Sequence, residues 1–249
     1  MYRIAVYTSF PEMLSTAQTL AEHLQLPLST TPESARFLLL LTPDYLGLQQ
    51  TGSLAHPLYV DFLSKKMRYR QQQASLRREA LARALGLKNN THPRIIDATA
   101  GLARDSFILA SLGFEVTLLE RSPIIYELLK NGIERAKQDT DMAAIISKLS
   151  LVQTNAIDWL KNSPPADMIY LDPMFPERKK SAQVKKEMTL FQEVIGEDTD
   201  SDELLKTALR CTKQRVAVKR PLHAQPLANL SPNFSIKGRS SRFDVYIPM

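Results

Sequence analysis

Apolar residues in the first quarter of the chain form short runs typical of strands and one stretch with helical spacing. Residues Arg3 to Tyr7 and Arg36 to Leu41 suit strands, and Met13 to Leu24 suits a helix. We therefore expect a small N-terminal α/β lobe over residues 1–63.

Residues 64–92 have a different character. From Lys65 to Arg78 this segment is rich in arginine and glutamine and contains no acidic residue. Apolar residues recur at helical spacing in its second half, at Leu76, Ala80, Leu81 and Ala84. Gly86 suits a helix C-terminus. The segment is predicted to be a basic helical linker.

From Pro93 onward, strand-like and helix-like patterns alternate. The expected strands are Arg94 to Ala98, Glu115 to Leu119, Leu149 to Gln153, Asp167 to Leu171 and Arg215 to Lys219. The expected helices are Arg104 to Leu112, Pro123 to Lys137 and Asp202 to Cys211. Two further runs, Phe234 to Lys237 and Phe243 to Ile247, suit a hairpin. This order predicts an α/β domain over residues 93–249, with a doubly wound, mostly parallel sheet that gains an antiparallel strand from the hairpin.

Composition narrows the class of protein. The single cysteine, Cys211, excludes an internal disulfide and a thiolate metal cluster, and the four histidines are scattered, so we expect no metal. The longest aliphatic run, Phe37 to Leu41, is too short to span a bilayer, and the N-terminus lacks the pattern of a signal peptide. These features favour a cytoplasmic protein without a membrane segment. Nothing in the pattern indicates an oligomeric state.

The net charge of +6 is compatible with a polyanionic partner. Besides the basic residues from Lys65 to Arg78, a second basic cluster begins at Arg178 and contains Lys179, Lys180, Lys185 and Lys186. It directly follows the segment with the strongest chemical signal, which we describe next.

That segment is Asp172-Pro173-Met174-Phe175-Pro176, which follows the apolar run Met168 to Leu171. A carboxylate, prolines and an aromatic ring at the C-terminal end of a buried strand suit a pocket for a planar, amine-bearing ring. Asp172 and the Pro173 carbonyl can accept the two N–H bonds of an amine, and Phe175 can stack on the ring. The segment therefore suggests methyl transfer to a nucleobase amine.

Three other strand ends carry groups that suit a methyl donor. The loop from Asp97 to Asp105 contains one glycine, Gly101, which is poor for a dinucleotide pyrophosphate but suits S-adenosyl-L-methionine. Asp97 or Asp105 can pair with the amino group of that cofactor. The remaining candidates are Glu120 for the ribose hydroxyls, Arg121 beside the adenosine, and Asn155 and Ala156 for the adenine.

Other functions fit the same residues. A nucleotide-dependent oxidoreductase uses a similar fold, and a non-catalytic RNA-binding assembly factor can keep a relic cofactor fold. Among methyltransferases, adenine N6 and protein glutamine are also compatible targets of the Asp-Pro-x-Phe pattern.

Several motifs together resemble the ribosomal small-subunit methyltransferase J family. They are Asp97-Ala-Thr-Ala-Gly-Leu-Ala-Arg-Asp105, Leu119-Glu-Arg121, Tyr170-Leu-Asp-Pro-Met-Phe-Pro176, Val184-Lys-Lys-Glu-Met188, Val218-Lys-Arg-Pro221 and Arg242-Phe-Asp-Val-Tyr246. The likeness spans almost the whole chain. Two departures are Ala103, where the family often has glycine, and Asn155-Ala156, where serines are familiar.

The resemblance implies a Rossmann-like methyltransferase fold with a seven-stranded sheet, S-adenosylmethionine as cofactor, and guanine N2 of 16S rRNA, free or in the small ribosomal subunit, as target. Cofactor contacts carried over from the family are Arg104, Asp105, Glu120, Arg121, Asn155, Ala156 and Asp172. With an RNA substrate, we expect phosphate contacts from the residues Lys65 to Arg78 and from Lys179, Lys180, Lys185, Lys186, Lys219 and Arg220.

Overall fold

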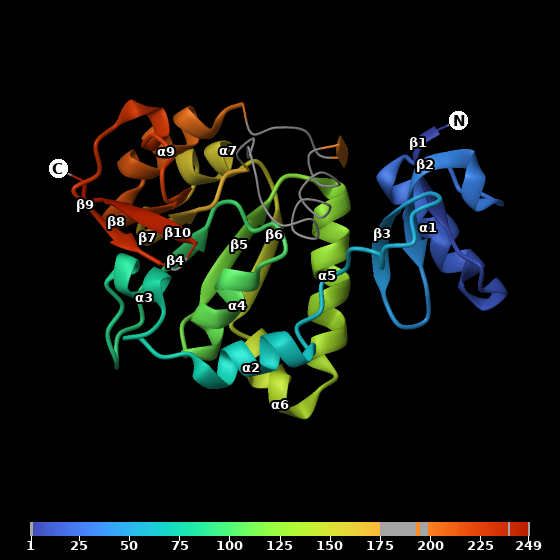
Figure 1. Ribbon diagram of the computed structural model, residues 1–249, viewed down its shortest axis with the longest axis horizontal. Helices are drawn as coiled ribbons and strands as arrows, with labels where there is room; N and C mark the ends of the chain where they lie inside the picture. Colours follow the sequence, from blue (N-terminus) through green and yellow to red (C-terminus); the bar gives the residue numbers. More distant parts are fainter. Residues whose placement is uncertain (1, 175–192, 195–198, 239, 249) are drawn as a thin grey trace. The chain divides into compact units, whose positions relative to one another are not determined.

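The computed structural model describes residues 2–174, 193–194, 199–238 and 240–248 (Figure 1). Two compact units account for them. The first is formed by the described parts of Met1–Asp61, Ser122–Arg135 and Pro176–Glu197, and the second by those of Phe62–Arg121, Ala136–Phe175 and Asp198–Met249. The boundaries expected from the sequence, after residues 63 and 92, stay a prediction.

The first unit contains a three-stranded sheet. Strand β1 (Tyr2–Tyr7) pairs in parallel with β2 (Ala35–Leu41), and β3 (Leu46–Gln50) pairs antiparallel with β2. Helix α1 (Leu14–Leu24) follows the short helix η1 (Pro11–Met13), and η2 (Pro32–Ser34) precedes β2. Strand β3 was not expected, because its glycine and two glutamines interrupt the apolar pattern.

Helix α5 (Pro123–Lys137) belongs to this unit as far as Arg135. The Asn131 side chain accepts a hydrogen bond from the Leu46 backbone N–H at 3.0 Å, and Arg135 donates to the Val60 carbonyl. A Cβ atom at Gly132 would lie 2.5 Å from the side chain of Val60, so only glycine permits this close approach. The helix is therefore fitted to residues that precede it by about 70 positions.

The second unit is built on a seven-stranded sheet in the order β6-β5-β4-β7-β8-β10-β9 (Figure 1). The strands are β4 (Ile95–Asp97), β5 (Val116–Glu120), β6 (Leu149–Gln153), β7 (Ala166–Leu171), β8 (Thr212–Pro221), β9 (Phe234–Lys237) and β10 (Ser241–Tyr246). The first five in that order are parallel, and β10 is antiparallel to both β8 and β9. The expected sheet and terminal hairpin are confirmed.

The helices of this unit are α2 (Lys65–Gln73), α3 (Ala80–Leu85), α4 (Arg104–Ser111), α6 (Thr140–Ile146), α7 (Ala156–Lys161), α9 (Ser201–Arg210) and the short η3 (Leu227–Asn229). The basic segment is thus two helices, with Leu76 in the turn between them. Gly86 ends α3 with a left-handed φ of 71°. The expectation overlooked α6 and α7, which are too short to show a clear period.

Alternation along the central strands sends their side chains to two different layers. Ile169 and Leu171 of β7 pack in a core with Leu160 of α7 and Leu205 of α9. Tyr170 lies on the other face, with its ring 6.3 Å from that of Phe243. In a strand, residues two apart share a face. Polar residues beyond β7 on the Tyr170 side are therefore carried toward α4.

A buried ion pair fixes β10 against the chain that leaves β8. Arg242 contacts Asp244 through Nε at 2.8 Å and Nη2 at 3.0 Å, and Asp244 is fully buried. The same guanidinium donates to the carbonyls of Pro221, Leu222 and Ala224. This cluster holds the C-terminal end of β8 in place.

We expect Asp244→Asn to lower the free energy of unfolding by about 3 kcal/mol, because it leaves the Arg242 charge without its buried partner. Urea unfolding followed by circular dichroism measures the change. Glu115→Gln, at an exposed side chain, serves as control and should be neutral. Equal stability of the two variants would contradict the anchoring role of the pair.

Candidate functional site

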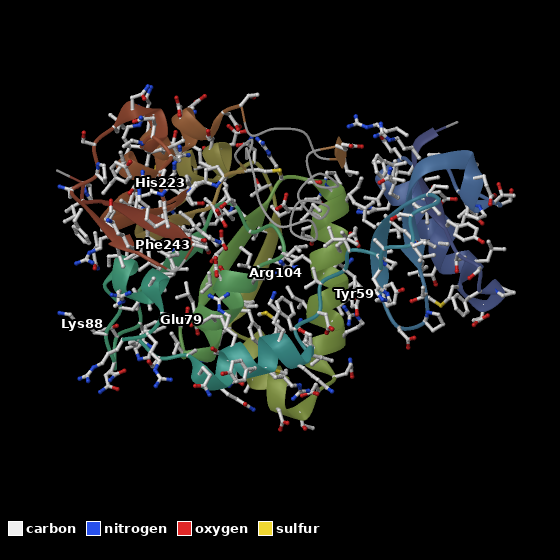
Figure 2. All side chains as sticks on the ribbon, viewed as in Figure 1. Tyr59, Glu79, Lys88, Arg104, His223 and Phe243 are labelled. Carbon is white, nitrogen blue, oxygen red and sulfur yellow. The ribbon has the colours of Figure 1, made fainter. Side chains whose placement is uncertain are left out.

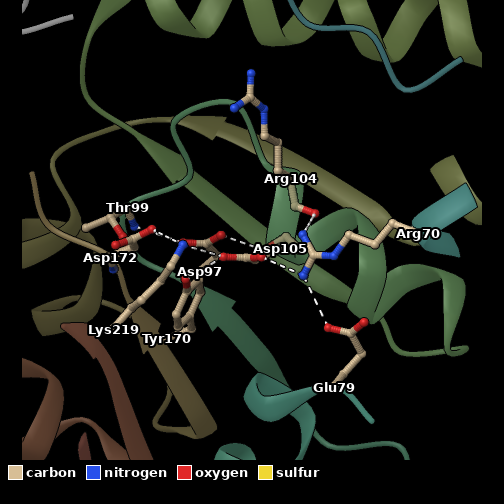
Figure 3. A network of polar contacts seen from close by, with 10 residues as sticks. Arg70, Glu79, Asp97, Thr99, Arg104, Asp105, Tyr170, Asp172 and Lys219 are labelled. Carbon is tan, nitrogen blue, oxygen red and sulfur yellow. Dashed lines mark hydrogen bonds and ion pairs between the residues drawn. The ribbon is translucent and has the colours of Figure 1, made fainter. Parts of the chain in front are cut away.

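The C-terminal ends of β4, β7 and β8 bring several charged side chains together (Figure 3). On the paired strands β7 and β8, Leu171 lies opposite Val218. The next residues, Asp172 and Lys219, consequently lie side by side. The Lys219 Nζ atom is 2.8 Å from Oδ2 of Asp172 and 2.8 Å from Oδ2 of Asp105, which lies in the first turn of α4.

Charge pairing dominates the electrostatics of this group. Burial opposes the ionisation of Asp105, but the Lys219 ammonium and the Arg70 guanidinium outweigh it and hold the pKa of Asp105 well below its usual range. Burial likewise opposes the charge on Lys219, yet Asp105 and Asp172 raise its pKa above the usual value. Burial and the Asp105 charge raise the pKa of Tyr170, whose hydroxyl donates to Asp105 Oδ2 at 2.9 Å. All three groups thus keep their ordinary charge at neutral pH.

Helix α2 contributes a further cation. Arg70 reaches Asp105 Oδ1 at 2.9 Å and Glu79 Oε2 at 3.2 Å, and its Nη1 lies 3.5 Å from the backbone carbonyl of Arg104. Sequence reasoning missed Arg70, Glu79 and Tyr170 as members of the site. Arg70 and Asp105 are 35 positions apart, and no local pattern marks their contact.

Asp97 lies beneath this cluster and is only 2% exposed. Ser106 donates a hydrogen bond from its hydroxyl to Oδ2, and the Thr99 backbone N–H donates to Oδ1 at 3.1 Å. Burial, with added repulsion from Asp172 and Asp105, outweighs these bonds and raises the pKa of Asp97 to about 7. Asp97 therefore shapes the loop that follows β4 from below.

The loop after β4 is held close to the end of β5. Gly101 donates its N–H to Glu120 Oε2 at 3.0 Å, and Ala100 donates to the Leu119 carbonyl at 3.1 Å. Gly101 has a φ of +52°, and an added Cβ would meet only the Thr99 carbonyl, at 3.9 Å. Ala103 also has a left-handed φ, of 51°, which explains why glycine is favourable there. The bare backbone at Gly101 can lie close to a ligand.

The other predicted cofactor residues have defined places. Asn155 caps α7, where its Oδ1 accepts from the Ile157 N–H at 2.8 Å, and Ala156 is buried beside it. Arg121 pairs with Asp200 at 2.8 Å, and Arg104 is exposed at the start of α4. Their contacts with a cofactor stay predictions.

The predicted phosphate contacts differ in their surroundings. Arg220 is buried and donates from Nε to the Gln225 carbonyl at 3.0 Å, and Lys219 is held between two carboxylates. Phe175, Lys179, Lys180, Lys185 and Lys186 lie outside the described residues. Their roles therefore remain expectations from the sequence.

The donor set fits S-adenosylmethionine. Three carboxylates, Asp105, Asp172 and Glu79, share two cations, Lys219 and Arg70, so the cluster has an acidic excess before Asp97 is counted. That cofactor carries a sulfonium and an ammonium group, both of which an acidic cluster attracts. Glu120, at the end of β5, lies where an acid binds ribose hydroxyls in dinucleotide folds.

Two other classes of site were searched in the described part of the chain. None of its helices has the length and apolar character needed to cross a bilayer. Within the same residues, no group of three or more His, Cys, Asp or Glu side chains is placed to hold a metal ion.

Comparisons with known proteins agree with this geometry. A family model described as "Putative SAM-dependent methyltransferase" matches residues 19–248. Ribosomal RNA small subunit methyltransferase J of Thioalkalivibrio sulfidiphilus is 47% identical over 249 residues, which cover 98% of each chain. The protein of the same name from Nitrosococcus oceani is 46% identical, with 95% of each chain covered.

A solved structure also matches. The crystal structure of a SAM-dependent methyltransferase from Neisseria gonorrhoeae has a TM-score of 0.75 and 33% sequence identity. The match covers 98% of this chain and 96% of that one. The Rossmann-like methyltransferase fold expected from the resemblance is thereby confirmed.

The raised pKa of Asp97 predicts a pH dependence of stability. Its pKa is 3.8 ordinarily and about 7 in the folded protein, so the folded state binds more protons there between these values. This group's contribution to stability therefore falls as pH rises from about 4 to about 7 and is constant above that. The wild type should lose stability relative to Asp97→Asn over this range, by at most about 1.4 kcal/mol per pH unit.

Urea unfolding at several pH values measures this difference without any ligand. Asp158→Asn, at an exposed carboxylate, is the matched control and should run parallel to the wild type. A wild type that runs parallel to Asp97→Asn as well would refute the raised pKa.

Proposed function

The chain belongs to the ribosomal RNA small subunit methyltransferase J family, and on that premise we propose that it methylates the exocyclic N2 amine of a guanine in 16S rRNA. It is an S-adenosylmethionine-dependent methyltransferase. A substrate of this kind places its action in the cytoplasm, on free 16S rRNA or on the small ribosomal subunit.

The observation that carries the proposal is the placement of Asp172. Its backbone N–H donates to the Thr99 hydroxyl at 2.6 Å, which ties the residue after β7 to the loop after β4. Its carboxylate is held by Lys219 at 2.8 Å. A hydrogen-bond acceptor is thus fixed beside the loop that we assign to the cofactor. The buried Pro173 follows directly and adds its carbonyl as a second acceptor.

These acceptors suit the chemistry of a nucleobase amine. The lone pair of such an amine is delocalised into the ring, so the nitrogen is a weak nucleophile. When Asp172 and the Pro173 carbonyl accept its two N–H bonds, the lone pair is directed out of the ring plane. Alignment of this kind can lower a barrier by about 7–11 kcal/mol. After transfer, the amine proton leaves through Asp172, which already accepts its hydrogen bond.

S-adenosylmethionine, when bound, supplies an electrophilic methyl group on a sulfonium. We assign Glu120 to the ribose hydroxyls and Asp105 to the amino end, because each is an acid at a strand end or helix start beside the Gly101 loop. Asn155 and Ala156 remain the candidates for adenine.

Helix α2 supports an RNA substrate. Its inner side carries the buried Met67 and two paired arginines, Arg68 with Asp139 at 2.6 Å and Arg70 with Asp105. Its outer side exposes Lys65, Lys66 and Tyr69, and the Tyr69 side chain is 67% exposed. Among the described residues, the two lysines make no ion pair. Free ammonium groups around an exposed aromatic ring suit RNA phosphates and an unpaired base.

One experiment tests the proposed reaction. Guanine methylation is mapped in 16S rRNA from cells with the gene intact, deleted, or restored as wild type, Asp172→Ala or Glu115→Ala. We expect one N2-methylguanine to be lost on deletion and restored by the wild type and by Glu115→Ala. Purified Asp172→Ala should transfer methyl groups at least a hundredfold more slowly, because the amine is no longer held in position. A modified adenine or protein glutamine in place of guanine would refute the proposal.

A second prediction concerns RNA binding by α2. The double variant Lys65→Ala/Lys66→Ala should lower the slope of log affinity against log salt by about 1.4, at about 0.7 for each phosphate contact. Filter binding to 16S rRNA over a range of salt concentrations measures the slope. The control, Lys88→Ala/Lys206→Ala, removes the same charge at two exposed lysines and should keep the wild-type slope (Lys88 is labelled in Figure 2). A slope that both double variants lower equally would contradict a specific role for α2.

A further inference from the structure

Lys219 has a hydrogen-bond donor that the cluster does not use. An ammonium group has three N–H donors. Among the described residues, two acceptors lie within reach of Nζ, Oδ2 of Asp105 and Oδ2 of Asp172, each at 2.8 Å. The Lys219 side chain is 29% exposed, so the third donor is open to a ligand.

The position of this donor is well fixed. Lys219 lies in β8, which pairs with β7 on one side and with β10 on the other. Its two carboxylate partners come from different segments, α4 and the end of β7. A side chain held from two directions keeps one orientation, and the cost of ordering it for a ligand is small.

We propose that the third N–H of Lys219 donates to O6 of the target guanine, so that Lys219 and Asp172 together select guanine. The inference rests on the proposed function, since it assumes a guanine amine at Asp172. It adds a specificity-determining residue to the acceptors that hold the amine.

The edge of guanine matches this pair of side chains. It offers in sequence two donors, the N2 amine and N1–H, and one acceptor, O6. Asp172 is an acceptor and the adjacent Lys219 is a donor, so the two patterns are complementary. Adenine and cytosine both have a ring nitrogen without hydrogen next to their amine. That nitrogen would face the Asp172 carboxylate, and no carbonyl follows it on that edge, so the site would leave charged groups unpaired.

The test compares two proteins on two substrates. Site-specific ligation places either guanosine or 6-thioguanosine at the mapped position of 16S rRNA. Sulfur is a weaker acceptor than oxygen, whereas N1–H and the N2 amine are retained. The wild type should have about tenfold lower kcat/KM on the thio substrate, the size expected for one charge-assisted hydrogen bond. Lys219→Met, assayed at saturating cofactor, should be slower on guanosine and should not distinguish the two substrates.

Lys213→Met is the matched control, because Lys213 lies at the other end of the same strand and is exposed. It should keep the full wild-type discrimination. A structural role of Lys219 alone would slow both substrates equally and leave the ratio unchanged, which would overturn the inference. Should Lys219→Met fail to fold, the wild type alone decides, since equal rates on both substrates also overturn it. Methylation at an atom other than guanine N2 would refute the proposed function as well.

Discussion

The Lys219 ammonium is the interaction on which this site depends. Two carboxylates from different segments converge there, and without a cation between them they would repel each other at close range. Removing Lys219 would leave this repulsion within a partly buried cluster, whereas Lys219 alone would be a charge with no partner. The three groups are therefore stable only as a set. Their mutual attraction fixes the relative position of α4, the end of β7 and the end of β8.

Arg70 extends this set to α2. It contacts the Asp105 oxygen that Lys219 does not, so Asp105 is held by both cations at once. The helix that presents Lys65, Lys66 and Tyr69 to solvent is thus connected through one side chain to the group assigned to the methyl donor. A displacement of α2 by RNA would be felt at Asp105 directly. Binding of substrate and arrangement of the site are coupled by two consecutive ion pairs.

Much of this could be predicted from the sequence, for a physical reason. Buried parallel strands are continuous apolar runs, and their ends are marked by the first polar residue, as Asp97, Glu120 and Asp172 are. Since all parallel strands end at one edge, the approximate location of the site follows from the pattern alone. Short elements such as β3 and α7 have too few residues for a period, and so they were missed.

The partners of each charge could not be predicted in this way. Lys219 looked like a surface cation for RNA, because a lysine after a strand gives no indication of which carboxylates lie across the sheet. Its contact with Asp105 spans 114 positions and depends on strand order, which sets β8 beside β7. Arg220, equally basic in the sequence, points into the protein instead. Neighbouring residues on a strand face opposite layers, so adjacent charges acquire unrelated roles.

The protein also separates its charges by distance. It is basic overall, yet the cluster at the strand ends has an acidic excess. Exposed charges attract a polyanion over roughly one Debye length, about 10 Å at moderate salt. Paired carboxylates in a partly buried site act only over hydrogen-bond distances, where they favour a cationic cofactor and an N–H edge. A basic surface can therefore attract RNA without disturbing the acidic groups, because the two effects operate at different ranges.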